Sequence, residues 1–542
     1  MISIFMLSLI GAIFRFTSLN WDAGGRLHPD EALIINGALS IQFFSQLFPG
    51  FHDYNGLSVY LVKLASLIVA FLSGEKWLTE TAEGMTLVGR FLSAFFATLT
   101  IPIVYSIGTK LWNKRVGLTA ALLLTFSPLC IQLAHFYTTD TLLLFLLSIL
   151  LYFFVSYWKT PRTYFVIALG ITAGLLLATK STSFLMLPLP IAVLFFRRNT
   201  TSSVFGHICI FLMVCIALFF IASPYSFIDL PGFLNRTDYL SNVVSGKLEQ
   251  DWTIQFRDTN GLFWIPNALY AFGPLAIVGF IGIAGTVFHK RMWRTHRSVF
   301  ILALWITGFS IFLGLTYLKF IRYSAPLTPF LALFAAKWMW DIQNKRVKHV
   351  LISSVLLAQI LWGTMFFHIY LVPHTSIEAT NWISKNIPSR SVILLEYSNS
   401  ILKFSRPELT ANQYQTVLFN FYTLPDNAQK SEKLNTFLRQ SDYIILESPK
   451  GKNTVLRHKY LYPYASRFYE RLIDANPEFT NIATFTSYPM LGPLVLNDES
   501  SEETFTVFDH PTITIYKVNH LLPTFSSTNR PIFYGEREIS GK

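Results

Sequence analysis

The chain has 542 residues, of which 52% are hydrophobic and 14% are charged, whereas about a quarter of the residues of an average soluble protein are charged. This composition excludes an ordinary soluble enzyme. The formal charge of +12 does not indicate nucleic acid, because basic clusters between hydrophobic spans are what orientation in a membrane requires. Cys130, Cys209 and Cys215 lie in apolar runs without metal-ligand spacing, so we predict neither a disulfide framework nor a cysteine metal site.

Apolar runs, many of about 17 to 25 residues, follow one another through the first two thirds of the chain, and such runs match the thickness of a bilayer core. We interpret the first run as a retained span, since it lacks a cleavage site and Arg15 interrupts it. About eleven spans are expected, at 1–19, 86–108, 116–134, 141–158, 163–179, 182–196, 204–223, 263–288, 298–317, 324–340 and 349–371.

The loops between these spans alternate in charge. Every second connection is basic, namely 110–115, 158–162, 197–199, 289–297 and 341–349, and the positive-inside rule makes these loops cytoplasmic. The large first loop, 20–85, then lies outside. Its apolar segment 55–73 carries Lys63 near the middle, where a charge at the bilayer centre costs about 2.5 to 3.5 kcal/mol, so we expect an interfacial helix there.

The composition changes after residue 371. Short β-rich runs at 391–397, 441–447 and 512–518 alternate with helical stretches, a pattern typical of a small α/β layer. The expected fold is therefore an α-helical polytopic membrane protein, residues 1–371, followed by an extracytoplasmic soluble α/β domain, residues 372–542.

The segment RLHPDEALI contains two adjacent acids, Asp30 and Glu31, directly after Pro29 at the predicted start of a helix. They are either simple first-turn acids, which favour a helix N-terminus, or groups that carry chemistry. His28 also allows two interpretations, either as a metal ligand or as a solvated loop histidine.

Further charged residues stand at predicted outer boundaries of spans. Asp140 follows Thr138 and Thr139, which also allows a helix-cap interpretation, and Lys180 lies between two apolar runs, where a lysine can also snorkel to the interface. Lys319, Arg322 and Tyr323 mark another outer boundary. Because these acids and cations share one side, the sequence predicts an anionic ligand at membrane depth, such as a lipid phosphate, with a carboxylate as general base.

The motifs that carry a family resemblance are HPDE, YNGLSVYL, VGRFLSAFFATLTIPIVY, HFYTTDTLLLF, GLLLATKSTSFLMLPLP and KFIRYSAPLTPFLA. In this order they resemble the polyprenyl-phosphate-sugar-dependent glycosyltransferases of the GT-C superfold, in particular the protein O-mannosyltransferase and aminoarabinose transferase-like group. SIEATNWISKNIP and ETFTVFDHPTITIYKV resemble the C-terminal parts of prokaryotic phospholipid-carrier-dependent glycosyltransferases. The chain reads DEALI where aminoarabinose transferases read DETRY, which leaves the acceptor open.

The resemblance implies roles for individual residues. Asp30 matches the catalytic base, Glu31 its neighbouring carboxylate, and Asp140 the second external acid. The positions that the resemblance and their location assign to substrate binding are His28, Tyr54, Asn55, Arg90, Lys180, Arg322 and Tyr323. The family also tolerates a divalent metal ion near the first external loop, although no coordination set is evident in the sequence.

The sequence thus predicts an inverting glycosyltransferase of the cell membrane. It would move one sugar from a polyprenyl-phosphate donor to an acceptor hydroxyl of a protein, a lipid or a cell-envelope glycan, with membrane lipids and no nucleic acid as partners. The alternatives are a transporter or flippase of a lipid-linked or small anionic substrate, and a non-catalytic surface-presentation protein.

Overall fold

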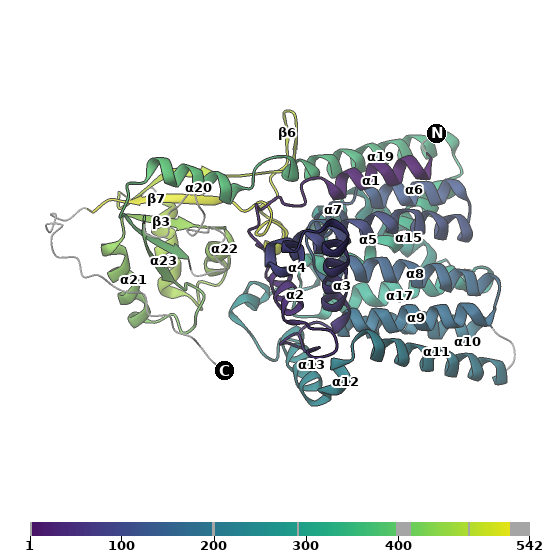
Figure 1. Ribbon diagram of the computed structural model, residues 1–542. Helices are drawn as coiled ribbons and strands as arrows, with labels where there is room; N and C mark the ends of the chain where they lie inside the picture. The colour runs from purple at the N-terminus through teal and green to yellow at the C-terminus, as the bar shows by residue number, and fades with distance from the viewer. Residues whose placement is uncertain (1–2, 198–200, 290–291, 397–412, 475–476, 521–542) are drawn as a thin grey trace.

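A computed structural model describes residues 3–197, 201–289, 292–396, 413–474 and 477–520. Most helices of the N-terminal part lie side by side in one bundle, and a mixed α/β part lies beyond one end of that bundle (Figure 1). The predicted basic loops 197–199 and 289–297 fall partly outside the described residues.

The bundle part alternates long helices with short ones that form its ends. Its elements are α1 (Ile4–Phe16), α2 (Pro29–Ser40), α3 (Gly56–Ser73), α4 (Trp77–Glu80), α5 (Ala82–Leu111), α6 (Lys114–Thr125), α7 (Pro128–Ala134), α8 (Thr139–Lys159), α9 (Thr163–Thr179), η1 (Ser181–Met186), α10 (Pro188–Arg197), α11 (Thr201–Ala222), α12 (Tyr225–Ile228), α13 (Leu230–Val244), η2 (Asp251–Phe256), η3 (Gly261–Phe263), α14 (Trp264–Phe272), α15 (Pro274–Val287), α16 (Met292–Thr295), α17 (Arg297–Leu315), η4 (Ile321–Leu327), α18 (Thr328–Asp341), α19 (Lys345–Phe367) and η5 (His368–Leu371).

The chain is a multi-pass membrane protein, but the long helices are fewer than the eleven expected spans. Six helices of the described residues are long and apolar enough to cross a membrane, or seven if the bent pair α6 and α7 counts as one span. Other expected spans form shorter apolar helices, such as α1, α9 and α15. Prolines contribute to this shortening of the helices, because Pro128 and Pro274 begin new helices where an unbroken span was predicted.

Helix α3 is one of the six by length and composition, yet it runs across the end of the bundle rather than along it (Figure 1). It buries Val59, Val62 and Ser66, while Leu67, Phe71 and other apolar side chains remain exposed. An apolar face turned outward at the end of a bundle is typical of a helix that lies in a membrane interface.

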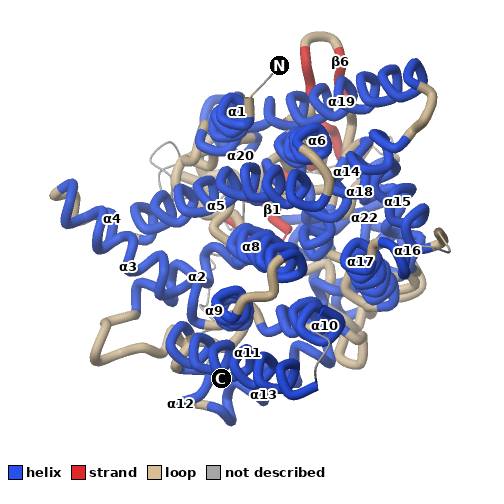
Figure 2. The backbone as a smooth tube through the Cα atoms, turned by 90° about the vertical axis from the view of Figure 1, so that its right-hand side faces the viewer, coloured by secondary structure: helices blue, strands red, loops and turns tan. Residues whose placement is uncertain are grey.

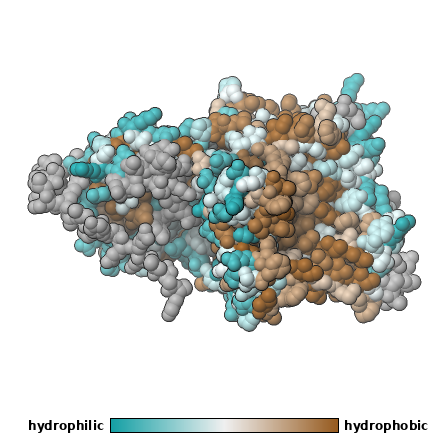
Figure 3. Space-filling view, viewed as in Figure 1, coloured by the Kyte–Doolittle hydropathy of each residue, from teal (hydrophilic) through white to brown (hydrophobic). Residues whose placement is uncertain are grey.

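On the face seen in Figure 3, a belt of apolar side chains covers the bundle, with hydrophilic residues at both of its ends. Seen along the bundle, α8 lies between α5 and α9 (Figure 2). One core of buried side chains joins most of these helices.

The C-terminal part contains a five-stranded mixed sheet in the order β2-β1-β3-β7-β4. The strand β1 is parallel to β2 and β3, and β7 is antiparallel to β3 and β4. Three predicted strands are confirmed as β1, β3 and β7. The elements are α20 (Thr375–Asn386), β1 (Val392–Glu396), β2 (Gln415–Phe419), α21 (Ala428–Gln440), β3 (Tyr443–Leu446), α22 (Lys450–Arg457), α23 (Pro463–Ile473), β4 (Phe479–Phe485), β5 (Met490–Leu491), β6 (Leu494–Val495), η6 (Glu503–Phe505) and β7 (Ile513–Val518).

The segment between β6 and β7 returns to the helix bundle. Phe505 and Val507 are part of the bundle core. Asp509 accepts hydrogen bonds from the Tyr370 hydroxyl at 2.6 Å and from the Gln132 amide at 3.0 Å. The two parts therefore share a buried interface, which the sequence did not predict.

Buried carboxyls make the C-terminal part sensitive to pH. Burial raises the pKa of Glu396 to about 7, and the neighbouring Glu447 and Glu503 carboxyls also raise it. Because the folded pKa lies above the ordinary value of 4.5, the stability that this carboxyl contributes is present at low pH and is lost as the pH rises through 7.

We expect Glu396→Gln to stabilise the protein at pH 8 by about 2 kcal/mol, because the amide is never ionised, and to have no such effect at pH 5. Thermal unfolding of the purified full chain at both pH values measures this difference. The surface substitution Glu432→Gln in α21 is the control and should not change the thermal stability at either pH. An equal effect of Glu396→Gln at both pH values would contradict the prediction.

Candidate active site at one end of the helix bundle

The first turn of α2 and the 3-10 helix η4 bring together Asp30 and Arg322, which are far apart in the sequence. The Arg322 guanidinium donates a hydrogen bond to the Asp30 carboxylate, and the two side chains are 15% and 21% exposed. The pair is therefore largely enclosed but still reachable. His28 lies beside it, with its Nε2 atom 3.4 Å from the Arg322 Nη1 atom.

A second pair lies next to the first. The Lys180 ammonium, at the C-terminal end of α9, is 3.3 Å from Asp140 in the first turn of α8. Two tyrosines connect the pairs, since Lys180 lies 4.9 Å from the Tyr323 ring and 5.8 Å from the Tyr54 ring, while Tyr54 hydrogen-bonds to Asp30. Asp30, Asp140, Lys180, Arg322 and the two tyrosines thus form one cluster, which we call the paired-charge cluster.

The charges in this cluster are set by their neighbours. Burial favours the neutral form of Asp30, but the adjacent Arg322 outweighs it and holds the pKa of that carboxyl well below its usual range. Burial lowers the pKa of His28 to about 4, so the imidazole is neutral at pH 7. His28 caps α2 by accepting a hydrogen bond from the Asp30 amide at 3.2 Å, and it is 3% exposed, unlike a solvated loop histidine.

Glu31 and Arg90 face away from the cluster into a closed ion-pair network. Arg90 donates to Glu31 at 2.6 and 2.9 Å and to Asp22 at 2.9 Å, and the Tyr137 amide donates to Glu31 at 2.8 Å. All three charged residues are fully buried. The network ties the loop before α2 to α5 and to the start of α8, and its charges are already paired with one another.

Asn55 connects two loops of the site. Its amide donates to the Leu177 carbonyl at 2.5 Å, and its side-chain oxygen accepts a hydrogen bond from Ser181 at 3.1 Å. These bonds flank Lys180 on both sides in the sequence. Asn55 is 2% exposed, so it holds the Lys180 loop in place beside Tyr54.

Residues of the C-terminal part contact the site, and the sequence did not predict these contacts. The Glu502 carboxylate accepts a hydrogen bond from the Ile321 amide at 3.0 Å, directly before Arg322, and the Phe508 ring lies 4.4 Å from the His28 ring. Asp22 was also missed, although an acid directly after the first apolar run is a signal that the sequence contains.

The expected divalent metal ion has no donor set among the residues that the structure describes, since they contain no group of three or more His, Cys, Asp or Glu side chains able to hold one. Asp30 and Asp140 each already face a cation. We therefore assign no step to a metal ion.

Glu31→Gln should destabilise the protein by about 3 kcal/mol, because it replaces a buried carboxylate oxygen that accepts from the Arg90 guanidinium by an amide nitrogen that cannot accept. A large fall in the unfolding temperature of the purified full chain is expected. Glu75→Gln, which removes an exposed acid between α3 and α4, is the matched control. If both substitutions have the same small effect, the network does not hold the loop.

Comparison with known proteins supports the resemblance. Residues 77–227, which contain Arg90, Asp140 and Lys180, match the family profile described as dolichyl-phosphate-mannose-protein mannosyltransferase. Among the curated proteins, none matches the chain.

The chain is also similar to solved structures, at identities low enough that the likeness concerns the fold alone. The oligosaccharyltransferase AglB from Archaeoglobus fulgidus, in complex with an inhibitory peptide and a dolichol-phosphate, has 13% identity and a TM-score of 0.50, with 91% of this chain and 74% of that chain covered. ArnT from Cupriavidus metallidurans, bound to undecaprenyl phosphate, has 12% identity and a TM-score of 0.48, with 96% and 99% covered. Residues 77–227 are thus similar to the dolichyl-phosphate-mannose-protein mannosyltransferase family, and the chain shares the fold of AglB.

Proposed function

We propose that the chain is an inverting glycosyltransferase that moves one sugar from a polyprenyl phosphate to an acceptor hydroxyl at the extracytoplasmic face of the cell membrane. The observation that carries this proposal is the paired-charge cluster. Two carboxylates and two cations from α2, α8, α9 and η4 meet there, partly enclosed, at one end of an apolar bundle.

Arg322 and Lys180 are suited to hold the donor phosphate. Guanidinium and ammonium groups bind phosphate by charge-assisted hydrogen bonds, and partial burial strengthens the attraction because the surroundings are less polar than water. Without a donor, Asp30 and Asp140 balance these cations. A phosphate that enters the cluster replaces the carboxylates as their partner.

This exchange explains how Asp30 becomes a base. While Arg322 is bound to it, the carboxylate has a pKa well below the usual range and is a weak base. When phosphate takes over Arg322, the pKa of Asp30 rises, and the carboxylate is able to accept the proton of the acceptor hydroxyl. The acceptor oxygen then bonds to the anomeric carbon, the bond from that carbon to the phosphate oxygen breaks, and polyprenyl phosphate leaves with the electron pair. Attack opposite the phosphate inverts the anomeric centre.

Glu31, Arg90 and Asn55 support this site as positioning residues, and His28, Tyr54 and Tyr323 line it. Basic residues at the opposite end of the bundle, such as Lys345 at the start of α19, support an extracytoplasmic location of the cluster. The same argument places the proposed soluble domain, residues 372–542, outside the cell. The apolar belt between the two ends offers the polyprenyl tail a surface in the membrane (Figure 3).

The position of the cluster also argues against the alternative function as a transporter. A transporter is expected to place charged residues near the middle of the membrane. Asp140 lies in the first turn of α8, and Lys180 directly follows the last residue of α9. These charges therefore lie at helix ends, which favours chemistry at one surface.

Asp30→Asn should reduce sugar transfer by about 10² to 10⁴-fold, because the amide cannot accept the acceptor proton, while binding of undecaprenyl phosphate is retained. Release of polyprenyl phosphate from a panel of labelled polyprenyl-phosphate sugars, with cell-envelope extract as acceptor, measures transfer. Asp229→Asn removes an acid paired with His52 outside the cluster and should remain active. Full activity of Asp30→Asn would remove this carboxylate from the mechanism.

Lys180→Ala should raise the KM for the donor by about tenfold or more, since one charge-assisted hydrogen bond to the phosphate is lost, with a smaller effect on kcat. Steady-state kinetics with the active donor of the panel provide the measurement. The exposed Lys247 supplies the control Lys247→Ala, whose donor KM should stay at the wild-type value. An unchanged KM for Lys180→Ala would exclude a phosphate contact by this lysine.

A further inference from the structure

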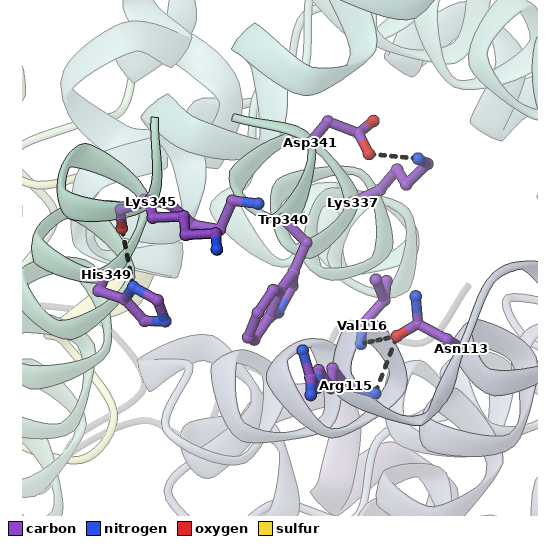
Figure 4. Close-up of a pocket in the computed structure, with 9 residues that line it drawn as sticks. Asn113, Arg115, Val116, Lys337, Trp340, Asp341, Lys345 and His349 are labelled. Carbon is purple, nitrogen blue, oxygen red and sulfur yellow. Dashed lines mark hydrogen bonds and ion pairs between the residues drawn. The ribbon is translucent and has the colours of Figure 1, made fainter. Parts of the chain in front are cut away.

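A cavity lies at the opposite end of the bundle from the paired-charge cluster. It has a volume of about 320 Å³ and is formed where α6 begins, α18 ends and α19 begins. Arg115, Lys337, Lys345 and Lys348 line it together with Trp340 and Asp341. Figure 4 shows the side chains of these elements around the opening.

The charges that line this basic pocket do not balance. Asp341 is its single acid, and that carboxylate lies 2.5 Å from the Lys337 ammonium. Arg115, Lys345 and Lys348 form no ion pair with an acidic residue of the described chain. Arg115 instead lies over the Trp340 ring at 5.6 Å. Several positive charges thus face one cavity without an anion.

The backbone adds to this positive field. The first turns of α6 and α19 line the pocket, and a helix N-terminus carries about half a positive charge. Neither helix has an acid in its first turn, where acids are normally favoured, and both begin with basic residues instead. The positive-inside rule explains why cations lie at this end, but it does not require them to meet around a cavity.

Two features of the pocket are typical of the depth of lipid headgroups. Trp340 donates a hydrogen bond from its indole to Thr119 at 3.0 Å, and tryptophan is enriched at the membrane interface. The hydrophilic end of the molecule borders the apolar belt directly on this side (Figure 3). A ligand in the pocket can therefore keep its acyl chains in the bilayer while its headgroup reaches the cations.

We propose that this pocket binds the phosphate headgroup of an anionic phospholipid of the cytoplasmic leaflet. Basic pockets between transmembrane helices on the cytoplasmic side recognise such headgroups by charge and hydrogen bonding. The phosphate contacts Arg115, Lys345 and Lys348, and the ends of α6 and α19 stabilise its charge. The site is separate from the proposed glycosyl transfer, because it lies at the other end of the bundle.

The chain itself provides a matched pair of variants. Arg115→Gln/Lys348→Gln removes one charge from each helix start inside the pocket. Lys114→Gln/Arg346→Gln removes the same number and kind of charges from the same two helix starts, but neither residue lines the pocket. Native mass spectrometry of the full-length protein, taken from vesicles of equal parts phosphatidylglycerol and phosphatidylcholine, counts the lipid that stays bound.

Wild type and the Lys114/Arg346 variant should each retain one phosphatidylglycerol in preference to phosphatidylcholine, and the Arg115/Lys348 variant should show at least tenfold lower occupancy. Equal loss in both variants would mean diffuse attraction to the surface and would overturn the proposal, as would equal retention in all three. Displacement of the lipid by 10 mM inorganic phosphate would show a site for a soluble anion and would equally overturn it.

One further variant tests the site without weakening it. Asp341→Asn removes the single acid of the pocket and releases Lys337, so it should raise phosphatidylglycerol occupancy at limiting lipid at least threefold. Unchanged occupancy in this variant would contradict the electrostatic basis of the site.

Discussion

Asp30 and Glu31 are neighbours in the chain but bind different arginines, and the site depends on this division. Consecutive residues of a helix point about 100° apart, so Asp30 faces Arg322 in the paired-charge cluster while Glu31 faces Arg90 of α5. The buried network of Glu31, Arg90 and Asp22 fixes the first turn of α2. The more accessible pair of Asp30 and Arg322 is thereby presented at a defined position, and it is this pair that a phosphate is able to separate.

The two parts of the molecule contribute to the same site. The C-terminal sheet lies beyond the bundle, but the segment before β7 enters the bundle core through Phe505 and Val507. Through Glu502 and Phe508 the same segment contacts the backbone before Arg322 and the ring of His28. The C-terminal part therefore contacts the residue directly before Arg322 and the histidine that caps the helix of Asp30.

The bundle has different electrostatic surroundings at its two ends. At the end next to the C-terminal part, each cation of the cluster is paired with a carboxylate, which keeps the site neutral until an anion competes for the cations. At the other end the cations of the basic pocket mostly lack acidic partners. Our two proposals thus concern phosphate groups at opposite surfaces, one exchanged during turnover and one retained as part of the lipid environment.

Composition and hydrophobic runs were enough to predict a multi-pass membrane protein with a C-terminal α/β part, since bilayer thickness and strand alternation act on local sequence. Motifs in their order along the chain indicated a family resemblance and suggested Asp30 and Glu31, Asp140, Lys180, and Arg90 and Arg322 alike as site residues. The sequence did not distinguish Asp30 from Glu31, or Arg322 from Arg90, because pairing between distant residues depends on how helices pack. Only the tertiary structure decided that Glu31 and Arg90 form a buried framework while Asp30 and Arg322 remain partly exposed. It also decided that a segment of the C-terminal part contacts the residues beside the second pair.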